Sequence, residues 1–133
     1  MQVSHWGRRT ALACGAVMCL SLADVAIAAS TGYDGAYRGT VTLTRGGESI
    51  CGKSSYQVAY TVVNGQFNVV YDAAHHVGVN LQVQADGSFS GNQNYQVGRQ
   101  NSQVKASGRI AGNVLEAQVE GEACTRSYHL TKS

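Results

Sequence analysis

Apolar and polar side chains alternate along most of the chain after residue 30, which is the pattern of strands that bury one face. Between residues 77 and 84, valine or leucine fills each odd position, and glycine, asparagine or glutamine fills each even one. No stretch of this region has a convincing helical periodicity. The pattern predicts an all-β fold of eight strands, whose apolar faces are, in chain order, Tyr37/Val41/Leu43, Tyr56/Val58/Tyr60/Val62, Phe67/Val69/Tyr71, Val77/Val79/Leu81/Val83, Phe89/Tyr95/Val97, Val104/Ala106/Ile110, Leu115/Ala117/Val119 and Tyr128/Leu130.

Turn residues between these segments predict that consecutive strands pair as antiparallel hairpins. Asn64-Gly65 has the sequence of a two-residue type I′ turn, which sets Tyr60 opposite Val69. A three-residue turn over residues 85–87, with Gly87 left-handed in a G1 bulge, keeps the apolar faces of its two strands together. Two-residue loops are also expected at Gly112-Asn113 and Gly121-Glu122.

Two cysteines bear on how this meander of strands closes. Cys51 follows the first strand and Cys124 begins the last one. An eight-stranded meander can form an open sheet, a sandwich or a closed barrel, and a bond between Cys51 and Cys124 joins segments that only a closed or nearly closed meander makes adjacent. The sequence therefore predicts a small antiparallel barrel with one disulfide, a size that is filled by side chains or holds one small ligand.

Residues 1–29 have the pattern of a cleaved export signal peptide. Arg8 and Arg9 give it a positive start, residues 11–23 are apolar apart from small residues, and Ala26-Ile27-Ala28 is a small-x-small cleavage pattern. The apolar run is too short for a membrane span, which needs about 20 residues. We expect residues 30–133 to form a single domain in the periplasm or outside the cell, with no stable membrane span after cleavage.

Removing this leader changes the composition of what remains. Cys14 and Cys19 leave with it, so Cys51 and Cys124 form the one expected pair in a compartment where disulfides persist. The remaining region has no Trp, Met or Pro, and its eight Lys and Arg residues nearly balance its seven Asp and Glu residues. That balance gives no electrostatic footprint for nucleic acid or for anionic lipid.

The meander also sorts its loops between two ends. Tight turns gather at one end, and longer segments around residues 46–53, 72–76, 98–102 and 121–122 gather at the other. Binding residues concentrate on loops held by a rigid scaffold. The longer-loop end is therefore the predicted contact surface, with candidate residues Glu48, Lys53, Asp72, His75, His76 and Arg99.

Candidate chemistry is sparse, and we expect no enzyme, no metal and no cofactor. His75-His76 after Asp72 is the only cluster that resembles a set of metal ligands, and solvated loop histidines explain it better than a zinc site does. His129 is expected to face outward from the last strand. Glu116 and Glu120 are expected at outward positions of the seventh strand, so they do not predict a catalytic pair.

Arg126 and Gln93 interrupt the apolar faces. The Gly121-Glu122 loop sets Val119 opposite Cys124 and Arg126 opposite Ala117. A buried arginine either satisfies an internal network or meets a ligand. Tyrosines sharing this interior bring hydroxyls that need partners, which leaves open a packed tyrosine core and a small cavity for an aromatic or amphipathic ligand. The candidate ligand-binding residues are Arg126, Tyr60, Tyr71 and Tyr128.

Several segments resemble small exported β-rich proteins common in alphaproteobacteria. They are Asp34-Gly35-Ala36-Tyr37-Arg38-Gly39, Asp86-Gly87-Ser88-Phe89-Ser90-Gly91 and Gly108-Arg109-Ile110-Ala111-Gly112-Asn113, followed by a final cysteine-containing strand. That resemblance implies no site residues, because the group has no established activity. The shape is also similar to avidin-type barrels, whose biotin site uses tryptophans that this region lacks. Small periplasmic inhibitors of lysozyme or proteases are similar in size, export and single disulfide, without shared signature residues.

Together these observations predict an exported, non-enzymatic binding protein. One hypothesis is a carrier that holds an unknown small ligand in a tyrosine-lined interior. The alternatives are a protein-binding envelope module, such as a lysozyme or protease inhibitor acting through the longer loops, and a purely structural envelope protein. The sequence leaves the oligomeric state open.

Overall fold

The computed structural model of the protein describes residues 31–133, and the predicted leader, residues 1–29, lies outside them. The all-β prediction is confirmed for the described region. Its helical elements are one 3₁₀ turn, η1 (Thr31–Tyr33), and one α-helical turn, α1 (Glu48–Cys51). Its strands are β1 (Gly35–Arg45), β2 (Ser55–Val62), β3 (Gln66–Asp72), β4 (Val77–Gln82), β5 (Ser88–Val97), β6 (Gln100–Ala111), β7 (Val114–Glu120) and β8 (Thr125–Lys132).

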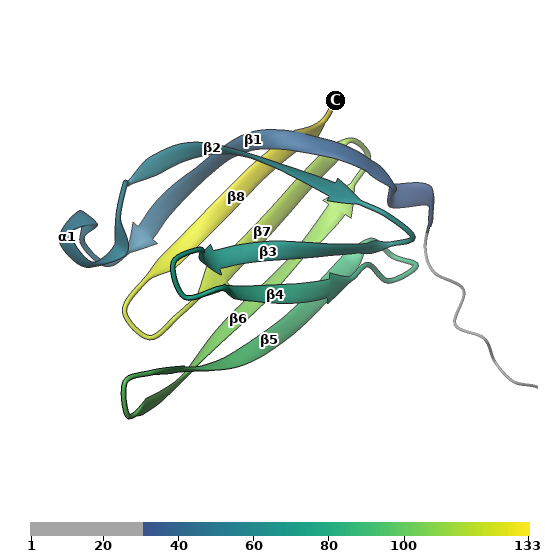
Figure 1. Cartoon of the computed structure of the whole chain (residues 1–133). Coiled ribbons are helices and arrows are strands. Elements are labelled where there is room, and N and C mark those ends of the chain that lie inside the picture. Colours follow the sequence, from purple (N-terminus) through teal and green to yellow (C-terminus); the bar gives the residue numbers. More distant parts are fainter. Residues whose placement is uncertain (1–30) are drawn as a thin grey trace, which may run out of the picture.

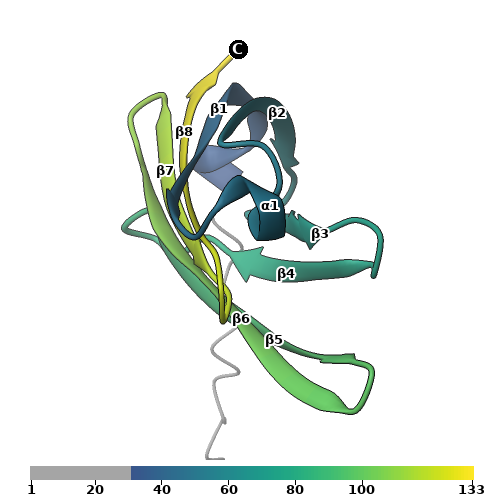
Figure 2. The ribbon, with the colours of Figure 1, turned by 90° about the vertical axis from the view of Figure 1, so that its left-hand side faces the viewer.

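Six strands form one antiparallel sheet in the order β2-β1-β8-β7-β6-β5, and β3 and β4 form a second, two-stranded sheet. The large sheet is a curled half-barrel, and the β3–β4 hairpin lies across its open side (Figure 1). Seen from the side, the end of the β5–β6 hairpin extends well beyond the other strands (Figure 2). None of the described helices is long and apolar enough to cross a membrane.

The first and last strands pair, as the cysteine positions predicted. β1 and β8 are antiparallel neighbours from Tyr37↔Lys132 to Arg45↔Thr125. The Arg45 guanidinium strengthens the end of this ladder by donating to the Thr125 hydroxyl (2.9 Å) and to the backbone carbonyl oxygen of Gly121 (2.7 Å). The predicted disulfide is also present, with 5.8 Å between the Cα atoms of Cys51 and Cys124.

The predicted ladder between β2 and β3 does not form. The Asn64-Gly65 turn has the expected left-handed backbone, and Val63 and Gln66 exchange two backbone hydrogen bonds across it. Beyond that bridge the strands belong to different sheets, so the predicted pairing of Tyr60 with Val69 is wrong. Aromatic rings fill the space between them, with 6.5 Å between the ring centroids of Tyr60 and Phe67.

The connection between β4 and β5 forms the predicted turn, but the two strands do not continue as a hydrogen-bonded ladder beyond it. Gln84 donates to the Ser88 carbonyl oxygen (2.8 Å), and Gly87 is left-handed, as in a G1 bulge. β5 then crosses β4 at Gly91, where an added Cβ would lie 2.9 Å from the Asn80 carbonyl oxygen. The ring of hydrogen bonds that a closed barrel requires is thus open on both sides of the β3–β4 hairpin.

One loop is longer than predicted, although the faces of its strands are unchanged. The Gly112-Asn113 loop has the expected register, with Ile110 opposite Leu115. The β7–β8 connection, in contrast, spans residues 121–124, so Val119 pairs with Arg126 rather than with Cys124. Because this shift is two residues, every side chain of β8 stays on the face that the sequence predicted.

The core lies between the concave face of the large sheet and the β3–β4 hairpin. Phe67 of the hairpin packs edge-on against Phe89 of β5, with 5.1 Å between ring centroids. The alternating positions predicted to face inward supply this core. Its largest fully buried side chains are Tyr37, Ile110, Leu115, Leu130, Val41, Val62, Val69, Val79, Val83, Val104 and Val119.

Candidate functional site

The longer loops lie at one end of the molecule, as predicted. The α1 segment, the β3–β4 turn, the β5–β6 turn and the β7–β8 loop all lie on the left in Figure 1, and the three tight turns lie opposite. The disulfide joins two of these loops directly, because Cys51 ends α1 and Cys124 precedes β8. We call this collection of loops the stapled end.

Arg126 is an internal clamp of the stapled end. Its side chain is buried, and its guanidinium donates to the backbone carbonyl oxygens of Cys51 and Lys53, the latter at 3.0 Å. The guanidinium carbon also lies 5.1 Å from the centroid of the Tyr56 ring, in cation–π geometry. These contacts correspond to the internal network that the sequence offered as one of two roles for Arg126.

A hollow of about 310 Å³ opens beside the disulfide. Tyr71, Asp72 and Arg126 line it, together with Ile50 and both cysteines. Glu48, another candidate of the stapled end, interacts with a neighbouring residue. Its carboxylate accepts the Ser54 N–H (2.7 Å), and hydrogen bonding to the Ser54 side chain and backbone lowers the pKa of Glu48. Lys53 contributes its backbone carbonyl oxygen to Arg126.

Asp72 organises the β3–β4 turn. Its carboxylate accepts the Ala74 N–H (3.0 Å) and lies 2.8 Å from His75 Nδ1. The hydrogen bond with His75 is the main reason that the pKa of Asp72 is lowered. His76 follows with a left-handed backbone. Within the described region, no group of three or more His, Cys, Asp and Glu side chains is placed to hold a metal ion.

The interior tyrosines pack against one another. Tyr60 and Tyr128 have ring centroids 6.2 Å apart, and Tyr71 and Tyr95 have the same separation. The Tyr128 hydroxyl is buried without a hydrogen-bond partner in the described structure, and burial raises its pKa. Burial also raises the pKa of Tyr60 and of Tyr71. These contacts make the tyrosines part of the core, and the ligand-binding role expected for them stays a prediction.

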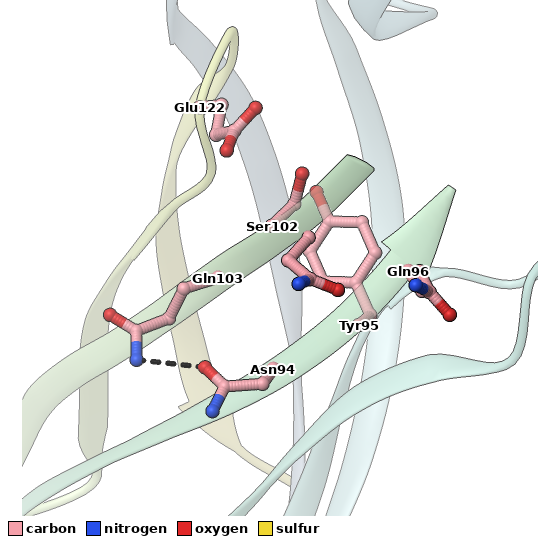
Figure 3. A pocket seen from close by; sticks show the side chains of 7 residues that line it. Asn94, Tyr95, Gln96, Ser102, Gln103 and Glu122 are labelled. Carbon is pink, nitrogen blue, oxygen red and sulfur yellow. Dashed lines mark hydrogen bonds between the residues drawn. The ribbon is translucent and has the colours of Figure 1, made fainter. Parts of the chain in front are cut away.

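The largest hollow that we find at the stapled end lies along the β5–β6 hairpin. It has a volume of about 770 Å³ and is lined by Asn94, Tyr95, Gln96, Asn101, Ser102, Gln103 and Glu122 (Figure 3). Glu122 comes from the β7–β8 loop and every other lining residue from β5 or β6. We call this hollow the amide groove, because four of its seven residues are Asn or Gln.

Pairing between β5 and β6 determines how these amides are arranged. Asn94 lies opposite Gln103, and Gln96 lies opposite Asn101, so the four side chains share one face of the hairpin. Gln103 donates to the Asn94 side-chain oxygen (3.0 Å), as Figure 3 shows. At the turn, Gln100 reaches Glu122 across the groove at 3.3 Å. Amides both donate and accept hydrogen bonds, so this lining suits an uncharged polar ligand surface.

The amide groove was not predicted from the sequence. The signal was present, because seven of the twelve residues from 92 to 103 are Asn or Gln. Gln93, which the alternation placed with the inner face, is exposed, and its side-chain amide donates to the Asn94 carbonyl oxygen (2.9 Å). Of the predicted loop residues, Arg99 forms part of the β5–β6 turn, close in sequence to this groove.

Comparisons with known proteins identify no relative of this chain. No protein-family model matches the chain, and no significant match was found among curated proteins or among solved structures. The resemblance to small exported proteins therefore stays a prediction, and function has to be argued from the geometry above.

Proposed function

We propose that the protein is an exported, non-enzymatic binding module whose contact surface is the stapled end, with the amide groove at its centre. The observation that carries this proposal is the groove itself. It is an open, shallow hollow whose lining brings together four side-chain amides, a tyrosine, a serine and a glutamate from two neighbouring strands and a loop. Tyr, Ser and Asn are also side chains that binding loops favour, since they combine rigid contact area with adaptable hydrogen bonds.

The character of the lining supports recognition rather than catalysis. Glu122 is the only carboxylate in the groove, and no histidine, cysteine or lysine lines it. General acid–base or nucleophilic chemistry needs such groups in matched positions. A surface of amides with one aromatic ring fits an exposed peptide or loop of an envelope protein. Export through residues 1–29 is part of this proposal, and the disulfide is compatible with an oxidising compartment.

The loop that contributes Glu122 to the groove is restrained by hydrogen bonds and by the disulfide. Arg45 ties β1 to the backbone of the β7–β8 loop by donating to the carbonyl oxygens of Gly121 and Glu122. The disulfide ties the same loop to α1. The backbone of Glu122 is therefore held in place relative to β1 and α1, which reduces the ordering that this loop needs when a partner binds.

A pull-down from envelope extract tests the proposal with a matched pair of variants. The double variant Asn101→Ala/Gln103→Ala removes two groove amides. The control, Gln66→Ala/Asn68→Ala, removes two exposed amides that bond across the β3–β4 hairpin to Gln82 and Asn80. We expect the first variant to lose a partner that the wild type and the control both retain. Equal capture by all three proteins would refute a role for the groove.

A second candidate function is carriage of a small ligand, which the buried Tyr128 hydroxyl favours. That hydroxyl makes no hydrogen bond of normal geometry within the described residues, although the Tyr56 and Tyr60 side chains lie close enough for weaker hydrogen bonding to contribute to the pKa shifts of this cluster. A ligand with one hydrogen-bonding group would satisfy it. A thermal-shift panel of small aromatic and amphipathic compounds tests this idea. Support requires a compound that raises the Tm of the wild type but not that of Tyr128→Phe.

A further inference from the structure

The outer half of the β5–β6 hairpin is a two-stranded ribbon without neighbours. The ladder between β6 and β7 starts at Lys105↔Glu120, and β4 crosses β5 at Gly91 without pairing. Among residues 31–133, the segments 93–97 and 100–104 are therefore paired only with each other. Figure 2 shows this ribbon projecting away from the body of the molecule. Both of its long edges carry backbone groups that no strand satisfies.

These two edges differ in their protection. Natural proteins block free edges with charges, proline, bulges or covering loops. The β6 edge faces the β7–β8 loop, and Glu122 from that loop meets Gln100 at 3.3 Å. The β5 edge carries no charge and no proline, because residues 88–97 contain no Lys, Arg, Asp, Glu or Pro, and its one local protecting contact is the Gln93 side-chain amide, which donates to the Asn94 carbonyl oxygen (2.9 Å) and which a pairing strand would displace. An uncharged, exposed edge of this kind is a template for another strand.

Backbone alternation identifies which residues present that template. The two-residue turn Gly98-Arg99 makes Val97 and Gln100 the closing hydrogen-bonded pair of the hairpin. Every second residue of β5 then points its N–H and C=O away from β6. On this count, the outward backbone groups belong to Asn94 and Gln96, the same residues whose side chains line the amide groove.

We propose that the free edge of β5 pairs antiparallel with the same edge of a second copy of this chain. A twofold axis through Tyr95 places Asn94 of each copy opposite Gln96 of the other, so each outward N–H meets an outward C=O. The facing side chains are then amide pairs, which can donate and accept in either direction. No like charges meet, because the segment carries none. A second copy fits this edge because the edge is complementary to itself.

Contact through one short edge is small, so the association is weak and concentration-dependent. Sedimentation equilibrium from about 10 μM to about 1 mM covers the range in which such a contact becomes populated. We expect the wild type to shift from monomer to dimer over this range. Gln96→Lys, which introduces a positive charge at the edge, should remain monomeric throughout.

Gln103→Lys is the matched control, because it makes the same change in the same ribbon but on β6. Gln96 and Gln103 both line the amide groove. Loss of a groove partner therefore affects both variants, whereas loss of self-association affects Gln96→Lys alone, and the two proposals fail separately. Circular dichroism verifies that both variants, which change exposed residues, keep the strand content of the wild type.

Three results would overturn the edge-pairing proposal. The first is a wild type that stays monomeric to about 1 mM. The β5 edge would then pair with a strand of another protein or with no strand at all. The second is equal loss of self-association in Gln96→Lys and Gln103→Lys. The third is a dimer in which hydrogen exchange at the Asn94 and Gln96 amides does not slow with concentration, because an edge ladder must protect those two N–H groups.

Discussion

At the scale of single residues, two buried tyrosines show how the hydrogen bonding of one hydroxyl changes its contribution to stability. Tyr37 is fully buried, and its hydroxyl donates to the Tyr33 carbonyl oxygen at 2.8 Å. Tyr128 is almost as deeply buried, but its hydroxyl has no partner among the described residues. A buried polar group is neutral or favourable when it is bonded and costs free energy when it is not. The same side chain is therefore expected to have opposite energetic effects at the two positions.

Removing each hydroxyl in turn tests this expectation. Tyr37→Phe loses a hydrogen bond and should lower the free energy of unfolding by about 0.5–1.5 kcal/mol. Tyr128→Phe removes a desolvated hydroxyl and should leave the free energy of unfolding unchanged or raise it by up to about 1 kcal/mol. Urea unfolding of the wild type and both variants measures the difference. Equal destabilisation by the two substitutions would mean that the Tyr128 hydroxyl has a partner, such as the hydroxyl of Tyr56 or Tyr60 or a buried water molecule.

Among the structural elements, the crossing of β4 and β5 depends on the absence of a side chain. Gly91 lies against β4, and an added Cβ would meet the Asn80 carbonyl oxygen at 2.9 Å, with Leu81 and Val79 methyl groups at 3.1 Å. A backbone oxygen cannot move aside cheaply. Gly91→Ala should therefore lower the free energy of unfolding by about 1–3 kcal/mol, as overpacking does.

Gly32→Ala is the control for this substitution, because nothing lies within 4 Å of an added Cβ there. Chemical denaturation should show little change for Gly32→Ala and a clear loss for Gly91→Ala. A Gly91→Ala variant as stable as the wild type would mean that the two strands separate at little cost, and that their crossing does not contribute to the fold.

Asp86 makes the β4–β5 turn sensitive to acid. Its carboxylate accepts the Ser88 hydroxyl (2.6 Å) and the Ser88 N–H (3.0 Å), and the hydroxyl bond is the main cause of its lowered pKa. A carboxyl group whose pKa is lower in the folded state stabilises the protein above its unfolded pKa of about 3.9. That contribution is lost as the pH falls through the folded pKa.

We therefore expect part of the acid sensitivity of the wild type to come from Asp86. Thermal unfolding between pH 6 and pH 2 should show a Tm that falls below about pH 4, where the carboxyl group begins to protonate. Asp86→Asn should have a lower Tm near neutral pH and a smaller decrease in acid. Parallel curves for the two proteins would assign the acid sensitivity to other carboxylates, such as Asp72 and Glu48, whose pKa values are also lowered.

The sequence allowed the elements to be predicted better than their lateral pairing. Period-two alternation identifies which residues face inward, and this result survives the two-residue register error at Val119 and Arg126, since a shift of two preserves the face. Alternation does not say whether neighbouring strands remain hydrogen-bonded beyond their turn. That outcome depends on the volume of rings such as Tyr60 and Phe67, which fill the space between β2 and β3. Whether the strands close into a hydrogen-bonded ring therefore could not be predicted without knowing how their side chains pack.

On the scale of the whole molecule, the sequence correctly placed the longer loops at one end, but it did not identify the side chains that line the amide groove there. Loop length and the cysteine positions indicated the stapled end, because both depend only on the order of strands along the chain. The amide groove depends on how far β5 and β6 extend beyond Gly91 and where the β7–β8 loop approaches them. Charged and histidine side chains drew the sequence-based prediction to the loops, whereas the groove is lined mostly by uncharged amides on the strands themselves.

The disulfide is the feature that joins the edges of the molecule. It spans 73 residues of sequence and connects α1 to the start of β8. In the chain-entropy model, a loop of this length stabilises the folded state by about 4 kcal/mol. Since the hydrogen-bonded ring is open at β3 and β4, the six-stranded sheet depends on this bond, on Arg45 and on Arg126 to hold its stapled end together.

Cys51→Ala/Cys124→Ala should therefore lower the free energy of unfolding by about 2–5 kcal/mol. The effect should also be local before it is global, because the bond restrains two loops rather than the core. Hydrogen exchange should quicken first at α1 and at residues 121–124, while Val41 and Leu130, in the paired centre of β1 and β8, keep their protection. Loss of protection in β1 and β8 together with these loops would show that the disulfide maintains the pairing of the first and last strands, rather than only the shape of the stapled end.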